Sequence, residues 1–331
     1  MCSRFSRKSY VIDALVQRGS VNISVGDSGI GKSPLHYQMG CSVASGLPFL
    51  GYTTSPGVVV YLDYENGLED MHRVLGGVSQ HLGLSSPPEN FLLKTFDGSS
   101  MGLGEIIAEI KPALCIIDTL RMFKPEAEEK NSNAAAMLSE LHTLARKHGT
   151  AFQLIHHPKK PGEAGFPPLE DTPTLTWLFQ ACGARALINQ TDVRIGIDVA
   201  KGMDRLGDRQ EGSRAEIALV FKAFFKSRGE IGPIYLERVF DENGDEPLGY
   251  RQLSGVNLLF NPEQRASFGR LPDEEFRFKQ AKAIYGRGDQ PTRDFLQKCI
   301  RIGILHQPAY GRYSKVKLEN AESGAQGQVS Q

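Results

Sequence analysis

The sequence contains little of what would place a chain in a membrane or cross-link it covalently. No stretch reaches the roughly 18 to 20 consecutive apolar residues that a membrane-spanning helix needs. The five cysteines are scattered and form no Cys-x-x-Cys pair, so we expect neither a disulfide framework nor a zinc site. The N-terminal segment has basic residues but no apolar core and no small-residue cleavage site. From these absences we expect a cytoplasmic protein without a membrane partner.

Net charge is also absent, because 38 basic residues balance 38 acidic residues in a chain of 331. The balance is uneven along the chain. Residues 276–318 contain ten basic and two acidic side chains, so this segment carries +8 and the remainder carries −8. A basic segment beside an acidic body predicts a separate module with a polyanionic partner, most simply nucleic acid. A solvated charged face on a small helical domain is the alternative.

Short apolar runs alternate with helical patterns through the first two-thirds of the chain. Strands are predicted at 21–25, 57–63, 113–118 and 151–155, and helices at 32–45, 67–82 and 133–148. Near-continuous apolar strands separated by helices predict an α/β fold with a mostly parallel sheet covered on both faces. Two further strands, at 215–225 and 233–240, are predicted to pair antiparallel at the sheet edge. The predicted organisation is a domain over 1–257, a linker over 258–273, a basic domain over 274–318 and a disordered tail over 319–331.

A phosphate-binding loop follows the first of these strands. Its pattern GxxxxGK[ST] is formed by Gly26, Asp27, Ser28, Gly29, Ile30, Gly31, Lys32 and Ser33. Glycines let the backbone wrap a phosphate group with its N–H groups pointing inward, and the N-terminus of the following helix adds a positive dipole. In such loops the lysine reaches the β- and γ-phosphates and the hydroxyl binds Mg²⁺. The motif therefore predicts ATP and Mg²⁺ as cofactors.

One residue departs from the usual loop. The residue after Ser33 normally gives a backbone N–H to the α-phosphate, but here it is Pro34, which has none. Proline fits the first turn of a helix, so the fold should survive. We expect weaker nucleotide binding, and restoring the N–H in a Pro34→Thr variant should strengthen it.

Acidic residues end two of the apolar strands. Asp118 ends the run 114–118 in a Walker B pattern, in which the carboxylate holds Mg²⁺ through water. Asp63 and Glu65 end the strand before it. A carboxylate beside the γ-phosphate can activate the attacking water, and we assign this role to Glu65 with Asp63 in support. Solvated strand ends are the alternative.

Two adjacent histidines close the strand at 151–155. A metal site at His156 and His157 would lack a third ligand at suitable spacing. A polar sensor of the γ-phosphate fits better, with Gln153 and His156 as candidates. A structural core histidine is the other interpretation.

The ordered set GDSGIGKS, YLDYEN, CIIDTLR and LIHHPKK resembles the RecA-like ATPases of the RepA hexameric-helicase type, an AAA-labelled family, over about residues 10 to 250. The resemblance implies a RecA-like P-loop core and a cyclic homo-oligomer, expected to be a hexamer. It also implies basic residues that reach the neighbouring subunit's γ-phosphate, for which Lys226 and Arg228 are the candidates and Lys222 a weaker one.

The basic C-terminal segment is predicted to form helix, turn, helix and hairpin, which resembles a winged helix. Its candidate phosphate contacts are Lys298, Arg301, Arg312 and Lys315. Small winged helices also serve as protein docking modules. Two long loops, 158–173 and 201–214, are expected to face a ring channel, with Lys159, Lys160, Lys201 and Arg205 as contacts to a DNA strand.

The leading hypothesis is therefore an Mg²⁺-dependent ATPase, a RepA-like helicase or DNA-remodelling motor. A nucleotide-gated DNA-binding regulator with slow turnover is the first alternative, favoured by Pro34. A P-loop kinase of a small metabolite is the second, but no lid is evident and the basic segment would be unexplained.

Overall fold

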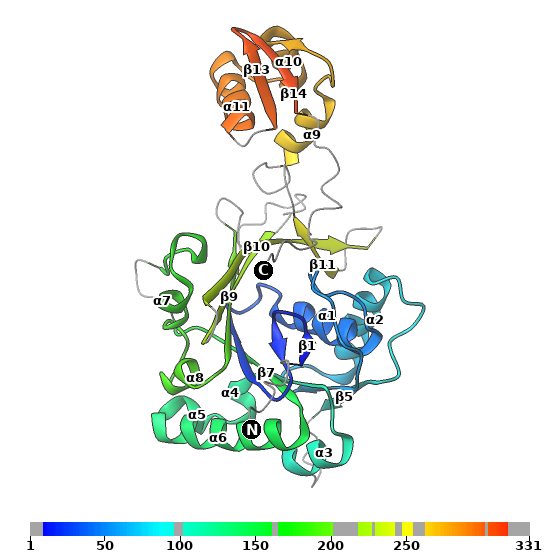
Figure 1. Ribbon diagram of the computed structural model, residues 1–331, viewed down its shortest axis with the longest axis vertical. Coiled ribbons are helices and arrows are strands. Elements are labelled where there is room, and N and C mark those ends of the chain that lie inside the picture. Colours follow the sequence, from blue (N-terminus) through cyan, green and yellow to red (C-terminus); the bar gives the residue numbers. More distant parts are fainter. Residues whose placement is uncertain are drawn as a thin grey trace, which may run out of the picture. The chain divides into compact units, whose positions relative to one another are not determined.

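A computed structural model describes residues 9–95, 102–160, 165–200, 218–226, 229–241, 247–253, 262–301 and 304–316 (Figure 1). The chain divides into two compact units, Met1–Gln252 and Leu253–Gln331. No helix within the described ranges is long and apolar enough to cross a lipid bilayer.

A nine-stranded sheet forms the centre of the first unit (Figure 1). Its strands, in spatial order, are β11 (Pro247–Leu253), β10 (Gly229–Phe240), β9 (Ala218–Phe225), β8 (Val193–Val199), β3 (Val21–Val25), β7 (Ala151–His156), β6 (Leu114–Asp118), β4 (Val59–Asp63) and β5 (Phe91–Thr95). The strands from β8 to β5 run parallel, and β9 and β10 continue the sheet antiparallel. The predicted α/β fold with a mostly parallel sheet is confirmed.

Helices cover both faces of this sheet, which is why its strands are apolar along their whole length. Every residue of β3, β4, β6 and β7 is buried. One face packs against α1 (Lys32–Ser45) and α2 (Leu68–His81). The other packs against α3 (Leu103–Ile110), α6 (Asn131–His148), α7 (Thr174–Leu178) and α8 (Ala186–Asn189), while α4 (Leu120–Phe123) and α5 (Glu126–Glu129) connect β6 to α6. A short ribbon of β1 (Tyr10–Ile12) and β2 (Val16–Gln17) precedes β3, and a 3₁₀ turn spans Leu169–Asp171.

The strand order decides where polar residues gather. The phosphate-loop strand β3 and the Asp118 strand β6 are not neighbours, because β7 lies between them. The register places His156 opposite Val25 and Asp63 opposite Asp118. The ends of β3, β7, β6 and β4 therefore lie side by side at the carboxyl edge of the sheet, where open α/β folds bind ligands.

The second unit has its own apolar core. Its elements are α9 (Pro262–Arg270), β12 (Phe276–Arg277), α10 (Phe278–Tyr285), α11 (Asp289–Arg301), β13 (Leu305–Ala309) and β14 (Arg312–Lys315). The strands form an antiparallel sheet in the order β12-β14-β13. Phe276, Phe295 and Tyr313 are buried with Leu271 between these elements.

The expected linker differs from what the structure describes. Helix α9 forms within residues 258–273, and Leu271, which follows it, is buried in the core of the second unit. The polar sequence of α9 hides this helix from prediction. Among its residues whose burial the structure describes, Ser267 alone is buried, and Phe268 packs at the edge of the core. The expected disordered tail, 319–331, lies outside the described residues.

Candidate nucleotide-binding site

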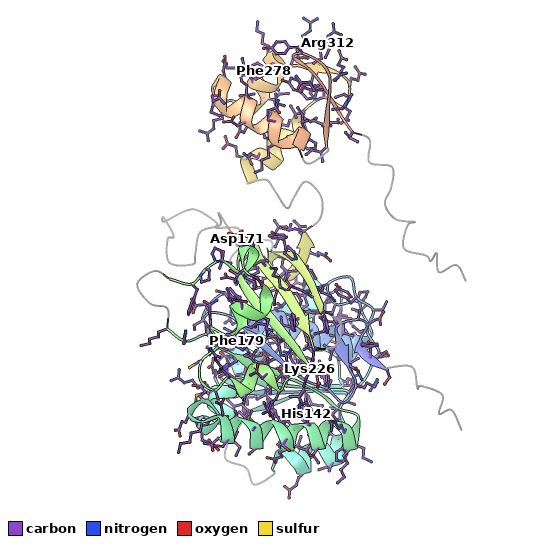
Figure 2. All side chains as sticks on the ribbon, turned by 60° about the vertical axis from the view of Figure 1, so that its left-hand side comes forward. His142, Asp171, Phe179, Lys226, Phe278 and Arg312 are labelled. Carbon is purple, nitrogen blue, oxygen red and sulfur yellow. The ribbon has the colours of Figure 1, made fainter. Side chains whose placement is uncertain are left out.

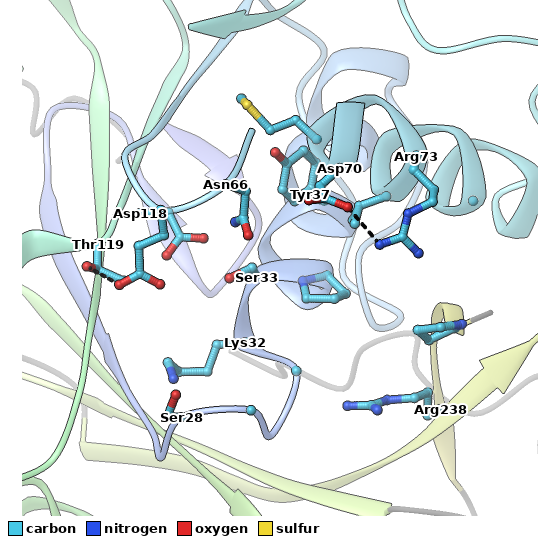
Figure 3. Close-up of a pocket in the computed structure, with 18 of the residues that line it drawn as sticks. Ser28, Lys32, Ser33, Tyr37, Asn66, Asp70, Arg73, Asp118, Thr119 and Arg238 are labelled. Carbon is cyan, nitrogen blue, oxygen red and sulfur yellow. Dashed lines mark hydrogen bonds and ion pairs between the residues drawn. The ribbon is translucent and has the colours of Figure 1, made fainter. Parts of the chain in front are cut away.

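A cavity of about 450 Å³ opens at the carboxyl edge of the parallel strands. The phosphate loop forms its floor, the ends of β4 and β6 form one wall, and α2 with β10 and β11 forms the other. Figure 3 shows Asp118 and Thr119 on one side, Arg73 and Arg238 on the other, and Lys32 and Ser33 between them.

The loop depends on glycine at Gly31. Its backbone φ is +96°, in the left-handed region that favours glycine. A Cβ atom there would lie 1.9 Å from the Tyr250 hydroxyl and 2.3 Å from Nη2 of Arg238. Gly29, with φ +75°, has open space around it. Helix α1 then begins at Lys32, so its N-terminus faces the cavity.

Lys32 is almost completely buried beside the loop that carries it. Its ammonium group donates 2.6 Å to the carbonyl oxygen of Asp27 and lies 3.3 Å from Nδ1 of His157. Burial lowers the pKa of Lys32 to about 8, and the nearby charges of Asp118, Asp27 and Glu65 oppose that shift. The lysine is thus a cation held in a poorly solvated position, where its attraction for phosphate is strong.

Asp118 is buried at the end of β6 and has an unusual carboxyl group. Burial raises its pKa to about 6, partly offset by the hydroxyl groups of Ser33 and Tyr61. Tyr61 donates 2.7 Å to Oδ2, while Oδ1 is buried without a hydrogen-bond partner in the described part of the chain. An unsatisfied carboxylate oxygen next to a serine hydroxyl fits Mg²⁺, which prefers oxygen ligands.

The protein alone would supply few metal ligands. Among the described residues, no group of three or more His, Cys, Asp or Glu side chains is arranged to hold a metal ion. Mg²⁺ in nucleotide sites is commonly held by one or two protein oxygens together with waters and phosphates. Asp118 and Ser33 match that pattern.

Glu65 lines the cavity just after the end of β4. The hydroxyl of Thr119 donates 2.9 Å to its Oε1, and Nε2 of His157 lies 3.7 Å from the same oxygen. The Glu65 side chain is 42% exposed, so it is accessible to water. A carboxylate oriented by two neighbours and open to solvent can accept a proton from a water molecule.

Asp63 contacts the turn that presents Glu65 and not the cavity itself. It is buried and does not line the cavity. Its Oδ1 accepts hydrogen bonds from the backbone N–H groups of Glu65 and Asn66, at 3.0 and 2.9 Å. The Tyr37 hydroxyl and the Asn66 amide donate to Oδ2, at 3.1 and 2.9 Å. Its acceptor positions are therefore used in shaping the turn that presents Glu65.

His157, not His156, faces the cavity. His156 is completely buried, its Nε2 lies 2.8 Å from the carbonyl oxygen of Cys182, and its Nδ1 lies 3.7 Å from Glu128. Gln153 is also completely buried and donates to Ser24. Burial lowers the pKa of both histidines. A neutral His157 accepts from Lys32 at Nδ1 and carries its proton on Nε2, towards Glu65.

Two arginines of the cavity lie outside the sequence motifs, and Thr119, although part of the motif CIIDTLR, was assigned no role from the sequence. Thr119 follows the Walker B aspartate, and Arg73 on α2 forms an exposed ion pair with Asp70 at 3.0 Å. Arg238 comes from β10, more than 200 residues after the loop it contacts, and donates 2.9 Å to the carbonyl oxygen of Ile30. No local pattern indicated Arg238; the polar residues that end β4 and β6 could have indicated Thr119.

The candidate trans-acting residue Lys226 lies elsewhere in the first unit. It follows β9, above the α6 helix that carries His142 in Figure 2. A second cavity, of about 630 Å³, is lined there by Lys226 with Arg18, Arg146 and Asp192. Lys222 is buried and donates to the carbonyl oxygens of Leu169 and Thr172, at 3.2 and 3.1 Å. Arg228, Lys201 and Arg205 lie outside the described residues.

The chain is similar to one known protein family and to solved structures of other proteins. Residues 2–163 match the profile of the AAA domain family. A KaiC-like protein from the hyperthermophilic archaeon Pyrococcus horikoshii is similar in structure, with a TM-score of 0.46 and 13% identity over 75% of this chain and 99% of that one. The RadB recombinase is also similar, with a TM-score of 0.44 and 17% identity over 72% of this chain and 92% of that one.

The loop, the strand order and the family match define a P-loop nucleotide-binding protein. The match over residues 2–163 agrees with the RecA-like P-loop class that the sequence motifs predicted.

Proposed function

We propose that the protein is an Mg²⁺-dependent ATPase that assembles into a ring and acts on nucleic acid, as a RepA-like helicase or DNA-remodelling motor. One observation supports hydrolysis in particular. Glu65, oriented by Thr119, lies in the same cavity as Lys32 and the carboxylate of Asp118. A phosphate-binding lysine, a metal-binding carboxylate and a solvent-accessible base are the parts that phosphoryl transfer to water requires.

The residues of the main cavity divide the work of ATP hydrolysis among phosphate binding, metal binding and activation of water. Nζ of Lys32 binds the β- and γ-phosphates, and the backbone of residues 26–33 surrounds them. Asp118 and Ser33 would hold Mg²⁺, and the bound ion would supply positive charge against the phosphates. Oε1 of Glu65 accepts the proton of the attacking water, and the Thr119 hydroxyl and His157 keep that oxygen in position.

Ring assembly would supply the remaining positive charge. Lys226 and Arg228 are the proposed trans-acting groups, and Lys226 has Arg18 and Arg146 beside it in the second cavity. In the first unit Lys226 does not line its own phosphate cavity. A contribution from Lys226 to hydrolysis would therefore have to reach a neighbouring subunit.

The second unit is the proposed nucleic-acid module. Its described residues, 262–301 and 304–316, contain eleven basic and six acidic side chains, a net charge of +5. Two of the proposed contacts are paired within the unit, Arg312 with Glu275 and Lys315 with Asp273, each at 2.9 Å. Tyr310, in the turn between β13 and β14, is 92% exposed. An exposed aromatic ring on a basic module suits stacking on unpaired bases.

The test is ATP turnover with and without single-stranded DNA in the wild type and in Glu65→Gln and Lys32→Ala variants. We expect Glu65→Gln to retain ATP binding and lose at least about 100-fold in turnover, and Lys32→Ala to lose binding. Strong stimulation by DNA supports the motor. Full turnover in Glu65→Gln would refute the assigned base, and phosphate transfer to a metabolite would indicate a kinase.

Slow turnover without stimulation would favour a nucleotide-gated regulator. Pro34 supports this second candidate, because the loop lacks one of the N–H groups that usually bind phosphate. In that case the second unit would be the working part, and DNA binding would depend on nucleotide but not on Glu65.

A further inference from the structure

The missing N–H of Pro34 leaves one side of the phosphate site without its usual donor. Pro34 lies in the first turn of α1 and lines the main cavity. The residue at this position normally donates to the α-phosphate. A phosphate oxygen that loses a donor in a partly enclosed site is under-solvated, which weakens binding.

A guanidinium group lines the same cavity. Nη2 of Arg238 donates to the carbonyl oxygen of Ile30 at 2.9 Å and to the Tyr250 hydroxyl at 3.0 Å, and Nε donates to that hydroxyl at 3.2 Å. The Arg238 guanidinium also lies 5.6 Å from the centre of the Tyr250 ring. Within the described residues, Nη1 makes no hydrogen bond, and both of its N–H groups remain for a ligand.

Arg238 is held in place by a buried support. Tyr250 is 1% exposed, and its hydroxyl donates 3.1 Å to the carbonyl oxygen of Gly31. The Gln38 side chain both donates to and accepts from the backbone of Tyr250, at 2.8 and 2.7 Å. The arginine thus has its orientation fixed before a ligand arrives, which reduces the entropy lost on binding.

We propose that Arg238 is a nucleotide-binding residue that contacts the α-phosphate and replaces the donor missing at Pro34. The inference rests on the proposed nucleotide binding at this loop and names one contact within it. A guanidinium group binds a phosphate oxygen through charge-assisted hydrogen bonds, which are stronger than the neutral N–H contact it replaces. Tyr250 is a positioning residue that acts through Arg238.

The other arginine of the cavity is less suited to this role. Arg73 lies on α2, and its guanidinium is paired with Asp70 at 3.0 Å. Its side chain is 52% exposed, so water weakens its attraction for phosphate. Arg238 is held against the phosphate loop itself, because it donates a hydrogen bond to the carbonyl oxygen of Ile30, the residue before Gly31.

The experiment measures dissociation constants of the full-length protein for ADP, AMP and adenosine by calorimetry or competition. Arg238→Gln should weaken ADP and AMP binding by about 10- to 100-fold, the range for one lost charge-assisted hydrogen bond. Adenosine, which has no phosphate, should bind the variant as it binds the wild type. Equal losses for adenosine and ADP, or no loss at all, would overturn the proposal.

The double variant tests the replacement directly. Pro34→Thr restores the N–H, so it should improve ADP binding more in the Arg238→Gln background than in the wild type. If the two substitutions act independently on ADP binding, Arg238 does not replace the Pro34 donor. Tyr250→Phe should weaken ADP more than adenosine, by less than Arg238→Gln does; an equal loss for both ligands would contradict its positioning role.

Arg251→Gln is the matched control. Arg251 lies next to Tyr250 on β11, but its guanidinium bonds Glu237 outside the cavity, at 2.6 Å. This variant should bind all three ligands as the wild type does. If wild-type protein fails to bind ADP, the proposed function itself fails. If it binds ADP and Arg238→Gln binds equally well, only the α-phosphate contact is refuted.

Discussion

The Tyr61 hydroxyl donates a hydrogen bond of 2.7 Å to Oδ2 of Asp118 from the neighbouring strand of the sheet. Both groups are buried, and Tyr61 stacks on Tyr37 with ring centres 4.1 Å apart. The phenol therefore fixes one oxygen of the carboxylate and leaves the other for a ligand. It also favours the ionised carboxylate at a position where burial disfavours it.

Replacing Tyr61 by phenylalanine should raise the pKa of Asp118 further, because the hydrogen bond that lowers it is lost. More of the carboxyl group is then protonated at pH 7, and Mg²⁺ binding weakens. We expect the acidic limb of the pH profile of kcat/KM to move to higher pH, by on the order of one pH unit. The profile of ATP hydrolysis at a fixed, sub-saturating Mg²⁺ concentration checks this; an unmoved limb would contradict the role of Tyr61.

Asp118→Asn should remove a pH-dependent penalty on folding. Burial raises the folded-state pKa from 3.8 to about 6. Between these values the native state binds more protons than the unfolded state, so the contribution of Asp118 to stability falls as pH rises. As pH rises from 4.5 to 7.5, the free energy of unfolding of the variant should increase relative to that of the wild type by on the order of 2 kcal/mol.

Urea unfolding of the full chain in EDTA, followed through the transition of the first unit, measures this gain. Other titrating groups are common to both proteins, so the difference isolates Asp118. Parallel stability curves across the pH range would show that its carboxyl group titrates as an ordinary aspartate.

ATP binding should take up protons at pH 8. Burial lowers the pKa of Lys32 to about 8, so about half of the population is neutral at that pH. Contact with phosphates favours the charged form and raises the pKa of Lys32. Calorimetry in buffers of different ionisation enthalpy should give a net uptake at pH 8 that falls towards pH 6.5. Lys32→Arg, which stays protonated, should abolish the uptake; persistence in this variant would assign the proton to another group.

Thr119→Val should affect turnover but not binding. The substitution removes the hydrogen bond of 2.9 Å that orients Glu65, while the buried position keeps a side chain of similar shape. We expect kcat to fall about 10-fold, with ADP affinity unchanged. Thr191→Val, at another buried threonine whose hydroxyl bonds the backbone of α8, should leave both values unchanged. An equal fall in both variants would point to general destabilisation.

Local patterns in the sequence predicted the loop and the strand that ends in Asp118, because both consist of contiguous residues. The same reasoning did not separate His156 from His157. Side chains alternate along a strand, and only the packing of β7 shows that His156 points into the core while His157 lies at the edge. Asp63 was expected to support Glu65, and only the structure shows that its carboxylate bonds the turn that presents Glu65.

Arg238 could not be predicted, because its role depends on long-range strand pairing. Residues of β10 reach the phosphate loop only after β8, β9 and β10 have extended the sheet beyond β3. The sequence around Arg238 resembles any half-exposed edge strand. The close contact of Arg238 and Tyr250 with the phosphate loop affects the local sequence at Gly31, where a larger residue would collide with both side chains.

The hydrogen bond between the Tyr250 hydroxyl and Gly31 has a mechanical consequence. The first unit ends at Gln252, two residues after Tyr250. Any backbone shift of the loop at Gly31 must either break this bond or pull β11 along with it. A strain generated at the phosphate loop would thereby be transmitted to the strand through which the chain leaves the first unit.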